Sequence, residues 1–169
     1  MTTAARTPPI GWCGLLANAT SIHAAGLDYI EAQWVPMKLD DDAAFATAKA
    51  RVRELPLPAL AMSYLFPHDV RIVVPGTDER RGRAYFDRVV ELLALARSRI
   101  VVLGSGWTRN IPEGWTQAQA ETEFLATLSW CADALQGSGT PLVIQPLYRK
   151  ESNLVAGRYA ANESGHRGV

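Results

Sequence analysis

The chain has 169 residues, of which 48% are hydrophobic and 20% are charged. This composition is ordinary for a globular domain with a substantial core, and it excludes a chain that is disordered throughout or a small disulfide-stapled scaffold. Lysine plus arginine equals aspartate plus glutamate, 17 against 17. No net positive field is therefore available to attract a polyanion, and we expect no nucleic-acid partner.

Membrane and metal signals are also missing from the sequence. No apolar run approaches the roughly 18 residues that cross a bilayer, and the start MTTAARTPP lacks the apolar stretch of a secretory signal. We expect a cytoplasmic protein with no membrane contact. Cys13 and Cys131 lie far apart without a metal-binding spacing, so we interpret both as small buried hydrophobic side chains in a reducing compartment.

Five short apolar runs bounded by turn residues predict buried strands. They cover residues 10–16, 29–33, 59–65, 100–103 and 142–147. Helical patterns separate them: a short one at 21–25, one between the aspartates at 40–42 and Pro56, one at about 78–98, and one after residue 116. Strict alternation of strand and helix implies parallel strands with helical crossovers, hence a (β/α) barrel or an open doubly wound sheet.

Helix-start signals support the assignment of these helices. Thr116 followed by Gln119 predicts a capping box, Thr77 is the expected N-cap of the 78–98 helix, and we interpret the aspartates at 40–42 as helix caps and not as a metal site. No GxGxxG or GxxxxGK[ST] follows the first strand, and the Gly-Ser-Gly at 104–106 is too short for either motif. The open flavodoxin-like sheet therefore stays only as the alternative fold.

Four strings in colinear order carry a family resemblance: GLDYIE at 26–31, FP at 66–67 with VRIVVPG at 70–76, VVLGSG at 101–106, and IQPLYRKESN at 144–153. Together they resemble the sugar-phosphate isomerase/epimerase family, the xylose isomerase-like TIM barrels. The similarity covers roughly residues 9–155. It implies a barrel whose site lies at the carboxyl ends of the strands.

The resemblance also implies a chemistry and a set of residues. In the family a divalent cation, Mn²⁺, Mg²⁺ or Co²⁺, polarises oxygens of a small sugar or sugar phosphate while glutamates move a proton. Glu31 and Gln145 are the catalytic candidates, and Gln145 also falls on the family's metal-binding glutamate. The residues that would bind the substrate are Ser63, His68, Ser105, Arg149 and Glu151.

Each candidate also has a plain structural explanation. Glu31 could face solvent, His68 could be a solvated loop residue, and the glycines at 104–106 could serve only a turn. Arg149 and Glu151 could pair with each other. The loop between Trp107 and Trp115 suits a lid over a sugar as well as it suits simple anchoring by aromatic side chains.

Two departures from the family pattern limit the expected activity. Gln145 stands at the glutamate position and Tyr148 at the following asparagine, and a neutral glutamine neither offsets a cation's charge nor accepts a proton. A complete barrel needs about 250 residues. We therefore expect a partial barrel in residues 1–155, followed by a disordered tail, 156–169, from a truncated or frame-shifted gene.

The sequence thus supports two hypotheses. One is a divalent-metal isomerase or epimerase impaired by its length and by Gln145. The other is a non-catalytic partial barrel that binds a sugar or assembles with itself or another chain through its open sheet edges. A metal-dependent endonuclease is disfavoured by the balanced charge and by the lack of clustered histidines.

Overall fold

The computed structural model describes residues 8–74 and 79–155. Its five strands form one parallel sheet in the order β1-β2-β3-β4-β5, so each strand pairs with its neighbour in the chain. The strands are β1 (Gly11–Gly14), β2 (Tyr29–Gln33), β3 (Ala59–Ser63), β4 (Ile100–Leu103) and β5 (Leu142–Ile144). This order confirms the predicted barrel-type progression and contradicts the reversing order of a flavodoxin-like sheet.

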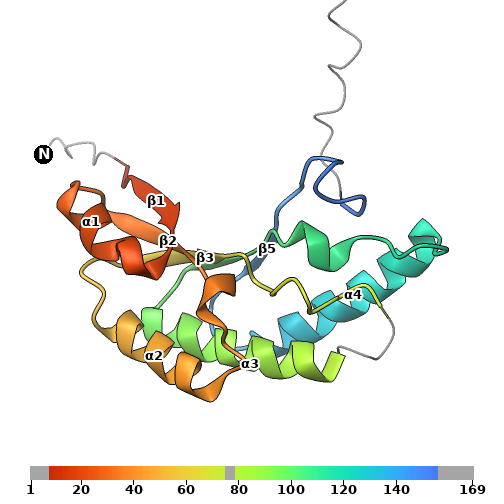
Figure 1. Ribbon diagram of the computed structural model, residues 1–169, viewed down its shortest axis with the longest axis horizontal. Coiled ribbons are helices and arrows are strands. Elements are labelled where there is room, and N and C mark those ends of the chain that lie inside the picture. The colour runs from red at the N-terminus through yellow and green to blue at the C-terminus, as the bar shows by residue number, and fades with distance from the viewer. Residues whose placement is uncertain (1–7, 75–78, 156–169) are drawn as a thin grey trace, which may run out of the picture.

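The helices leave one side of the sheet open. The α-helices are α1 (Ala19–Ala24), α2 (Asp42–Arg53), α3 (Glu79–Ala96) and α4 (Gln117–Ala134), and the 3-10 helices are η1 (Leu16–Asn18), η2 (Val35–Met37) and η3 (Gly106–Arg109). Figure 1 shows α2, α3 and α4 side by side beneath the sheet, with α1 beside the first two strands and the loop after β5 rising on the opposite side. This is the layering of a barrel wall with its outer helices.

Local signals set the helix starts. The Asp41 carboxylate accepts from the Ala44 N–H at 2.7 Å at the start of α2, and Thr116 and Gln119 form the predicted capping box of α4. Thr77, the expected cap of α3, lies outside the described residues. Strands β1, β3 and β5 are shorter than predicted. Leu16 already begins η1, and Tyr64, directly after β3, has a φ of 53°, which is outside the range of a β-strand.

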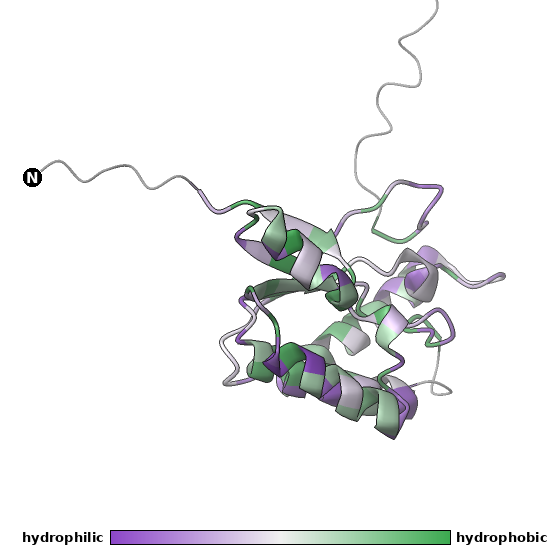
Figure 2. Ribbon diagram, turned by 60° about the vertical axis from the view of Figure 1, so that its left-hand side comes forward, coloured by the Kyte–Doolittle hydropathy of each residue, from purple (hydrophilic) through white to green (hydrophobic). Residues whose placement is uncertain are grey.

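The core lies between the sheet and the helices. The strand residues that face the helices are fully buried, namely Ile30, Ala32, Met62, Val101 and Leu103. An aromatic cluster continues this core between α3 and α4, where the Phe86 ring lies 5.7 Å from Trp130 and 6.0 Å from Phe66. Figure 2 shows hydrophobic and hydrophilic residues alternating around the helices, as expected for helices buried on one face.

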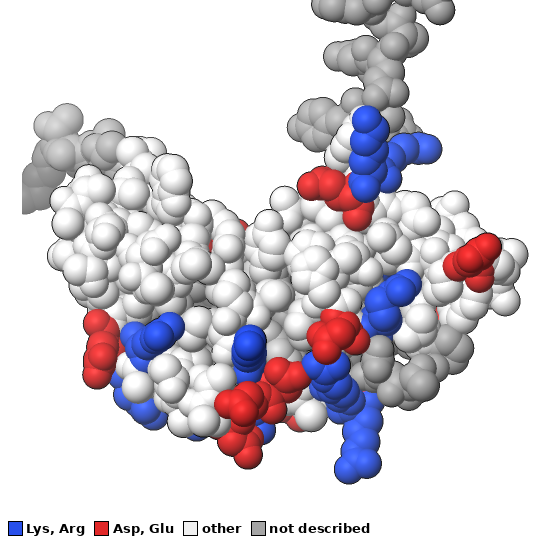
Figure 3. Space-filling model, viewed as in Figure 1, with Lys and Arg blue, Asp and Glu red and all other residues white. Residues whose placement is uncertain are grey.

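Ion pairs join the outer surfaces of α2 and α3. Lys49 contacts Glu91 at 2.9 Å, Arg81 bridges Asp40 at 2.5 Å and Asp69 at 2.7 Å, and Arg88 pairs with Asp42. The Arg81 guanidinium holds the pKa of Asp69 below its usual value. Figure 3 shows charged side chains gathered over these helices, whereas the hollow on the opposite side is bordered mostly by uncharged residues.

The open side exposes residues that a closed barrel would bury. Ile100 is 39% exposed and Val143 43%. Trp12 is 60% exposed for another reason: it lies on the edge strand, on the same side of the sheet as Ile30. The prediction that both cysteines are buried is wrong for Cys13, which is exposed because β1 is an edge strand with no second layer over it; Cys131 is buried as predicted. No helix among the described residues is long and apolar enough to cross a membrane.

Replacing Phe86 with alanine should destabilise the fold strongly, because the ring is fully buried between Phe66 and Trp130. We expect a loss of about 3–5 kcal/mol in urea unfolding. Leu125→Ala on α4 is the matched control, since that side chain is 63% exposed, and it should change stability by no more than about 0.5 kcal/mol. Equal losses in the two variants would contradict the assigned core.

Candidate functional site

Polar side chains of β1, β2 and β3 meet near the carboxyl ends of these strands. The Ser63 hydroxyl lies 3.7 Å from the Cys13 sulfur, and the Gln33 amide donates to that sulfur at 3.5 Å. Glu31 lies two residues before Gln33 on β2, so both point to the open side of the sheet. Ser63 is 5% exposed, so its hydroxyl is reached only through a small opening.

Gln145 directly follows β5 and lies against β4. Its N–H donates to the Leu103 carbonyl at 3.2 Å, and a Cβ built on Gly104 would lie 2.3 Å from the Gln145 Oε1. Only glycine at position 104 therefore lets the amide rest on β4 in this way. The glycine that the sequence offered as a turn residue thus has a packing role beside the expected catalytic position.

Three aromatic rings cover the carboxyl ends of β3 and β4. His68 stacks on Trp107 with 3.9 Å between ring centroids and 7° between planes, and Tyr64 lies 5.6 Å from Trp107. Tyr64 is 43% exposed and adopts a left-handed backbone conformation, which is uncommon for a bulky residue. The prediction of a loop histidine at 68 is confirmed, and its ring belongs to this stack.

Ser105 and Arg109 are buried beneath these rings. The Ser105 hydroxyl accepts from the Phe66 N–H at 3.2 Å, so its described partner is backbone. Arg109 is 0% exposed, and its guanidinium donates to the carbonyls of Gln145 at 2.6 Å and Leu103 at 3.4 Å. Burial lowers the pKa of Arg109 from its ordinary value.

The loop after β5 is held mostly by its own backbone. The Glu151 carboxylate accepts from the Tyr148 N–H at 3.3 Å, which closes a turn, and no ion pair between Arg149 and Glu151 occurs in the described structure. Asn153 accepts from the Ile111 N–H at 2.8 Å and so ties this loop to the one after β4. Substrate binding by Arg149 and Glu151 stays a prediction.

The described strands do not bring the two catalytic candidates together. Glu31 lies on β2 and Gln145 after β5, three strand spacings apart, and each spacing is about 4.8 Å along the sheet. Sequence reasoning missed Cys13, Gln33, Tyr64 and Arg109. The first two could have been found by strand alternation and the arginine by its position in a Gly-rich loop, but the left-handed Tyr64 has no signal in one sequence.

The described residues do not fit a divalent cation. No described group of three or more histidine, cysteine, aspartate or glutamate side chains is placed to hold a metal ion. Position 145, where the resemblance implies a metal-binding glutamate, carries a neutral amide next to a buried guanidinium. A site of oxygen ligands for Mg²⁺ or Mn²⁺ needs carboxylates, so these strands alone do not form one.

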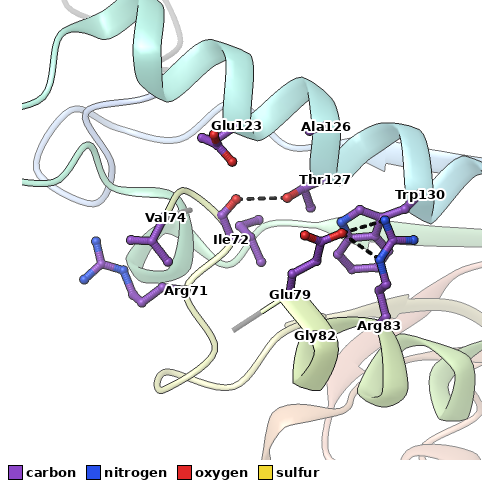
Figure 4. A pocket seen from close by; sticks show the side chains of 10 residues that line it. All are labelled: Arg71, Ile72, Val74, Glu79, Gly82, Arg83, Glu123, Ala126, Thr127 and Trp130. Atoms are coloured by element: carbon purple, nitrogen blue, oxygen red, sulfur yellow. Dashed lines mark hydrogen bonds and ion pairs between the residues drawn. The ribbon is translucent and has the colours of Figure 1, made fainter. Parts of the chain in front are cut away.

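A separate recess lies among the outer helices, between α3 and α4 (Figure 4). Four charged residues line it, Arg71, Glu79, Arg83 and Glu123. Glu79 and Arg83 pair with each other at 2.7 Å, and Arg83 lies over the Trp130 ring. Thr127 donates to the Ile72 carbonyl at 2.9 Å. Because these groups partner one another away from the strand ends, we assign the recess to helix packing.

Comparison with known proteins identifies the fold. No family model matches the sequence, and no curated protein does. Among solved structures, a D-psicose 3-epimerase in the presence of D-fructose matches with a TM-score of 0.67 and 17% identity, covering 88% of this chain and 55% of that one. An AP endonuclease family 2 protein from Brucella melitensis gives a TM-score of 0.63 with 19% identity over 85% and 57%.

A third match, the IolI protein with a bound zinc atom, has a TM-score of 0.56 and 14% identity over 81% of this chain and 51% of that one. The described residues therefore have the fold of part of the (β/α) barrel of these proteins. The chain spans about half the length of these structures. Because the endonuclease shares the fold with the epimerase, the likeness alone does not select between their activities.

Gly106→Ala should loosen the loop after β5. A Cβ at this position would lie 2.6 Å from the Glu151 carbonyl oxygen, a backbone atom that cannot move away alone. We expect a loss of about 1–3 kcal/mol in thermal or urea unfolding. Gly82→Ala is the control, because its Cβ would meet Val70 at 3.6 Å, an ordinary contact, inside α3.

The control variant should gain up to about 1 kcal/mol from helix propensity. A Gly106→Ala protein as stable as the unmodified chain would show that the loop does not pack on η3 as described.

Proposed function

We propose that this chain forms the sugar-binding wall of an isomerase or epimerase barrel and that catalysis by the chain itself is impaired. The observation that carries the proposal is the stack of Tyr64, His68 and Trp107 at the carboxyl ends of β3 and β4. Aromatic faces pack on the CH groups of a sugar. The Ser63 hydroxyl lies at the end of β3, and the Gln145 amide follows β5, next to β4. The ligand class is a small sugar or sugar phosphate.

The impaired state is supported by position 145. A glutamine cannot accept the proton that a glutamate would take from a sugar carbon. Glu31 is the remaining carboxylate among the strand residues of the open side, and it lies three strands away. The metal that the resemblance implies, Mn²⁺, Mg²⁺ or Co²⁺, needs ligands beyond the described ones, so turnover by this chain should be very low.

Calorimetry with D-fructose and D-fructose 6-phosphate tests the binding. We expect a weak but measurable affinity that Trp107→Ala lowers by about two- to twelvefold, since one aromatic contact is worth about 0.5–1.5 kcal/mol. Trp107→Phe should keep most of the affinity. Trp12→Ala is the control, because Trp12 is 60% exposed on the edge strand away from the stack. Binding that is indifferent to residue 107 would reject the proposal.

A coupled epimerisation assay with Mn²⁺ tests the impairment. We expect no turnover above background from the unmodified chain. Clear turnover would show that residues other than Glu31 and Gln145 carry the chemistry, and His68 would be the first to replace.

Assembly is the alternative function, and the exposed apolar residues favour it. Trp12 beside the β1 edge and Val143 on β5 are both substantially exposed, and an unpaired strand edge offers backbone groups to another chain. Sedimentation velocity over a range of concentrations should then show species larger than 18.4 kDa. Trp12→Lys should shift them toward the monomer, and a monomer at every concentration would exclude assembly of the chain with itself.

A further inference from the structure

A guanidinium without a carboxylate partner is enclosed at the carboxyl ends of β4 and β5. Arg109 is 0% exposed, and no ion pair in the described part of the chain includes it. Its Nη atoms donate to two backbone carbonyls, and its Nε has no partner among the described residues. Buried arginines are ordinarily paired with an anion. Among the described residues, the Arg109 guanidinium is hydrogen-bonded to backbone carbonyl groups and to no carboxylate.

The Arg109 guanidinium lies next to the backbone of residue 145. The Nη2 of Arg109 is 2.6 Å from the Gln145 backbone carbonyl oxygen, so any atom of that side chain lies within about 10 Å of this nitrogen by covalent reach. That distance is comparable to the Debye length of about 10 Å at 0.1 M salt, and burial reduces screening further. A charge placed on the side chain at 145 therefore interacts with Arg109.

We infer that Arg109 is a positioning residue for Gln145 whose fixed charge disfavours a divalent cation at this end of the sheet. Two features point the same way: the carboxylate that would attract a metal is replaced by a neutral amide, and the nearest buried charge is positive. Like charges in a poorly screened environment repel. A ligand oxygen that is neutral or anionic suits the Gln145 amide better than a metal ion does.

This inference goes beyond the proposed function, because it concerns the charge at position 145 whether or not a sugar binds. A purely structural role for Arg109, tying β5 to η3, predicts a different outcome. Arg109→Met removes both the donors and the charge, Arg109→Gln keeps a donor without the charge, and Arg109→Lys keeps both. A structural role therefore groups the glutamine variant with the lysine variant, whereas a charge role groups it with the methionine variant. The two roles can therefore be separated.

Mn²⁺ calorimetry at fixed ionic strength makes the separation. Gln145→Glu provides one anionic ligand and should bind Mn²⁺ only weakly. Adding Arg109→Met to it should tighten Mn²⁺ binding by at least about tenfold. Arg109→Gln, whose amide keeps a donor without the charge, should do the same, while Arg109→Lys should stay within about threefold of Gln145→Glu alone.

The inference is overturned if the methionine and glutamine variants at position 109 fold but gain no Mn²⁺ affinity. It is also overturned if none of the proteins binds Mn²⁺. An equal gain in the lysine variant would overturn it too.

A second measurement needs no change at position 109. Gln145→Glu by itself should raise the melting temperature at pH 7 by a few degrees, because the new carboxylate gains an attraction to an unpaired guanidinium.

Gln33→Glu on β2 is the matched control for that shift. This variant also replaces a glutamine amide with a carboxylate on the open side of the sheet, but at the end of β2, which does not border Arg109. It should not raise the melting temperature. An unchanged or lower melting temperature for Gln145→Glu would contradict the inference even if the neutral variants at position 109 did not fold.

Discussion

The packing of α2, α3 and α4 against one side of a parallel sheet is the interaction on which the rest of this structure depends. Each strand sends its most apolar residues toward the helices, as Ile30 and Ala32 of β2 do at 0% exposure. Because every crossover lies on that side, the strands must all run in one direction and end at one rim. The polar residues that follow the strands are gathered there as a consequence.

At that rim, close contacts between backbones decide what the side chains can do. Gly104 lets the Gln145 amide lie on β4, and Gly106 lets the loop after β5 approach η3. Arg109 then joins the ends of β4 and β5 through their carbonyls. These contacts hold the rim together. They also place the Arg109 guanidinium and the neutral Gln145 amide where the resemblance implies a carboxylate and a metal ion.

The sequence predicted the strands and helices well because each has a local signal. Short apolar runs fixed the five strands, and the pair Thr116 and Gln119 fixed the start of α4. The rim was predicted less well, since its properties arise from contacts between distant segments. The burial of Arg109 and the stacking of His68 on Trp107 are set by residues 36 and 39 positions apart, and no pattern in neighbouring residues reports them.

The two edge strands of the described sheet, β1 and β5, differ from each other, and this difference has a consequence for any association between copies. Pairing β5 of one copy with β1 of another continues the parallel sheet head to tail, so each added copy presents a fresh β5 edge. Such heterologous contacts extend into a filament unless their rotation closes a ring. A two-fold pairing of β1 with β1 would instead be antiparallel, and it would stop at two copies as long as the β5 edges stay unpaired. Which edges pair therefore decides between a limited and an unlimited assembly.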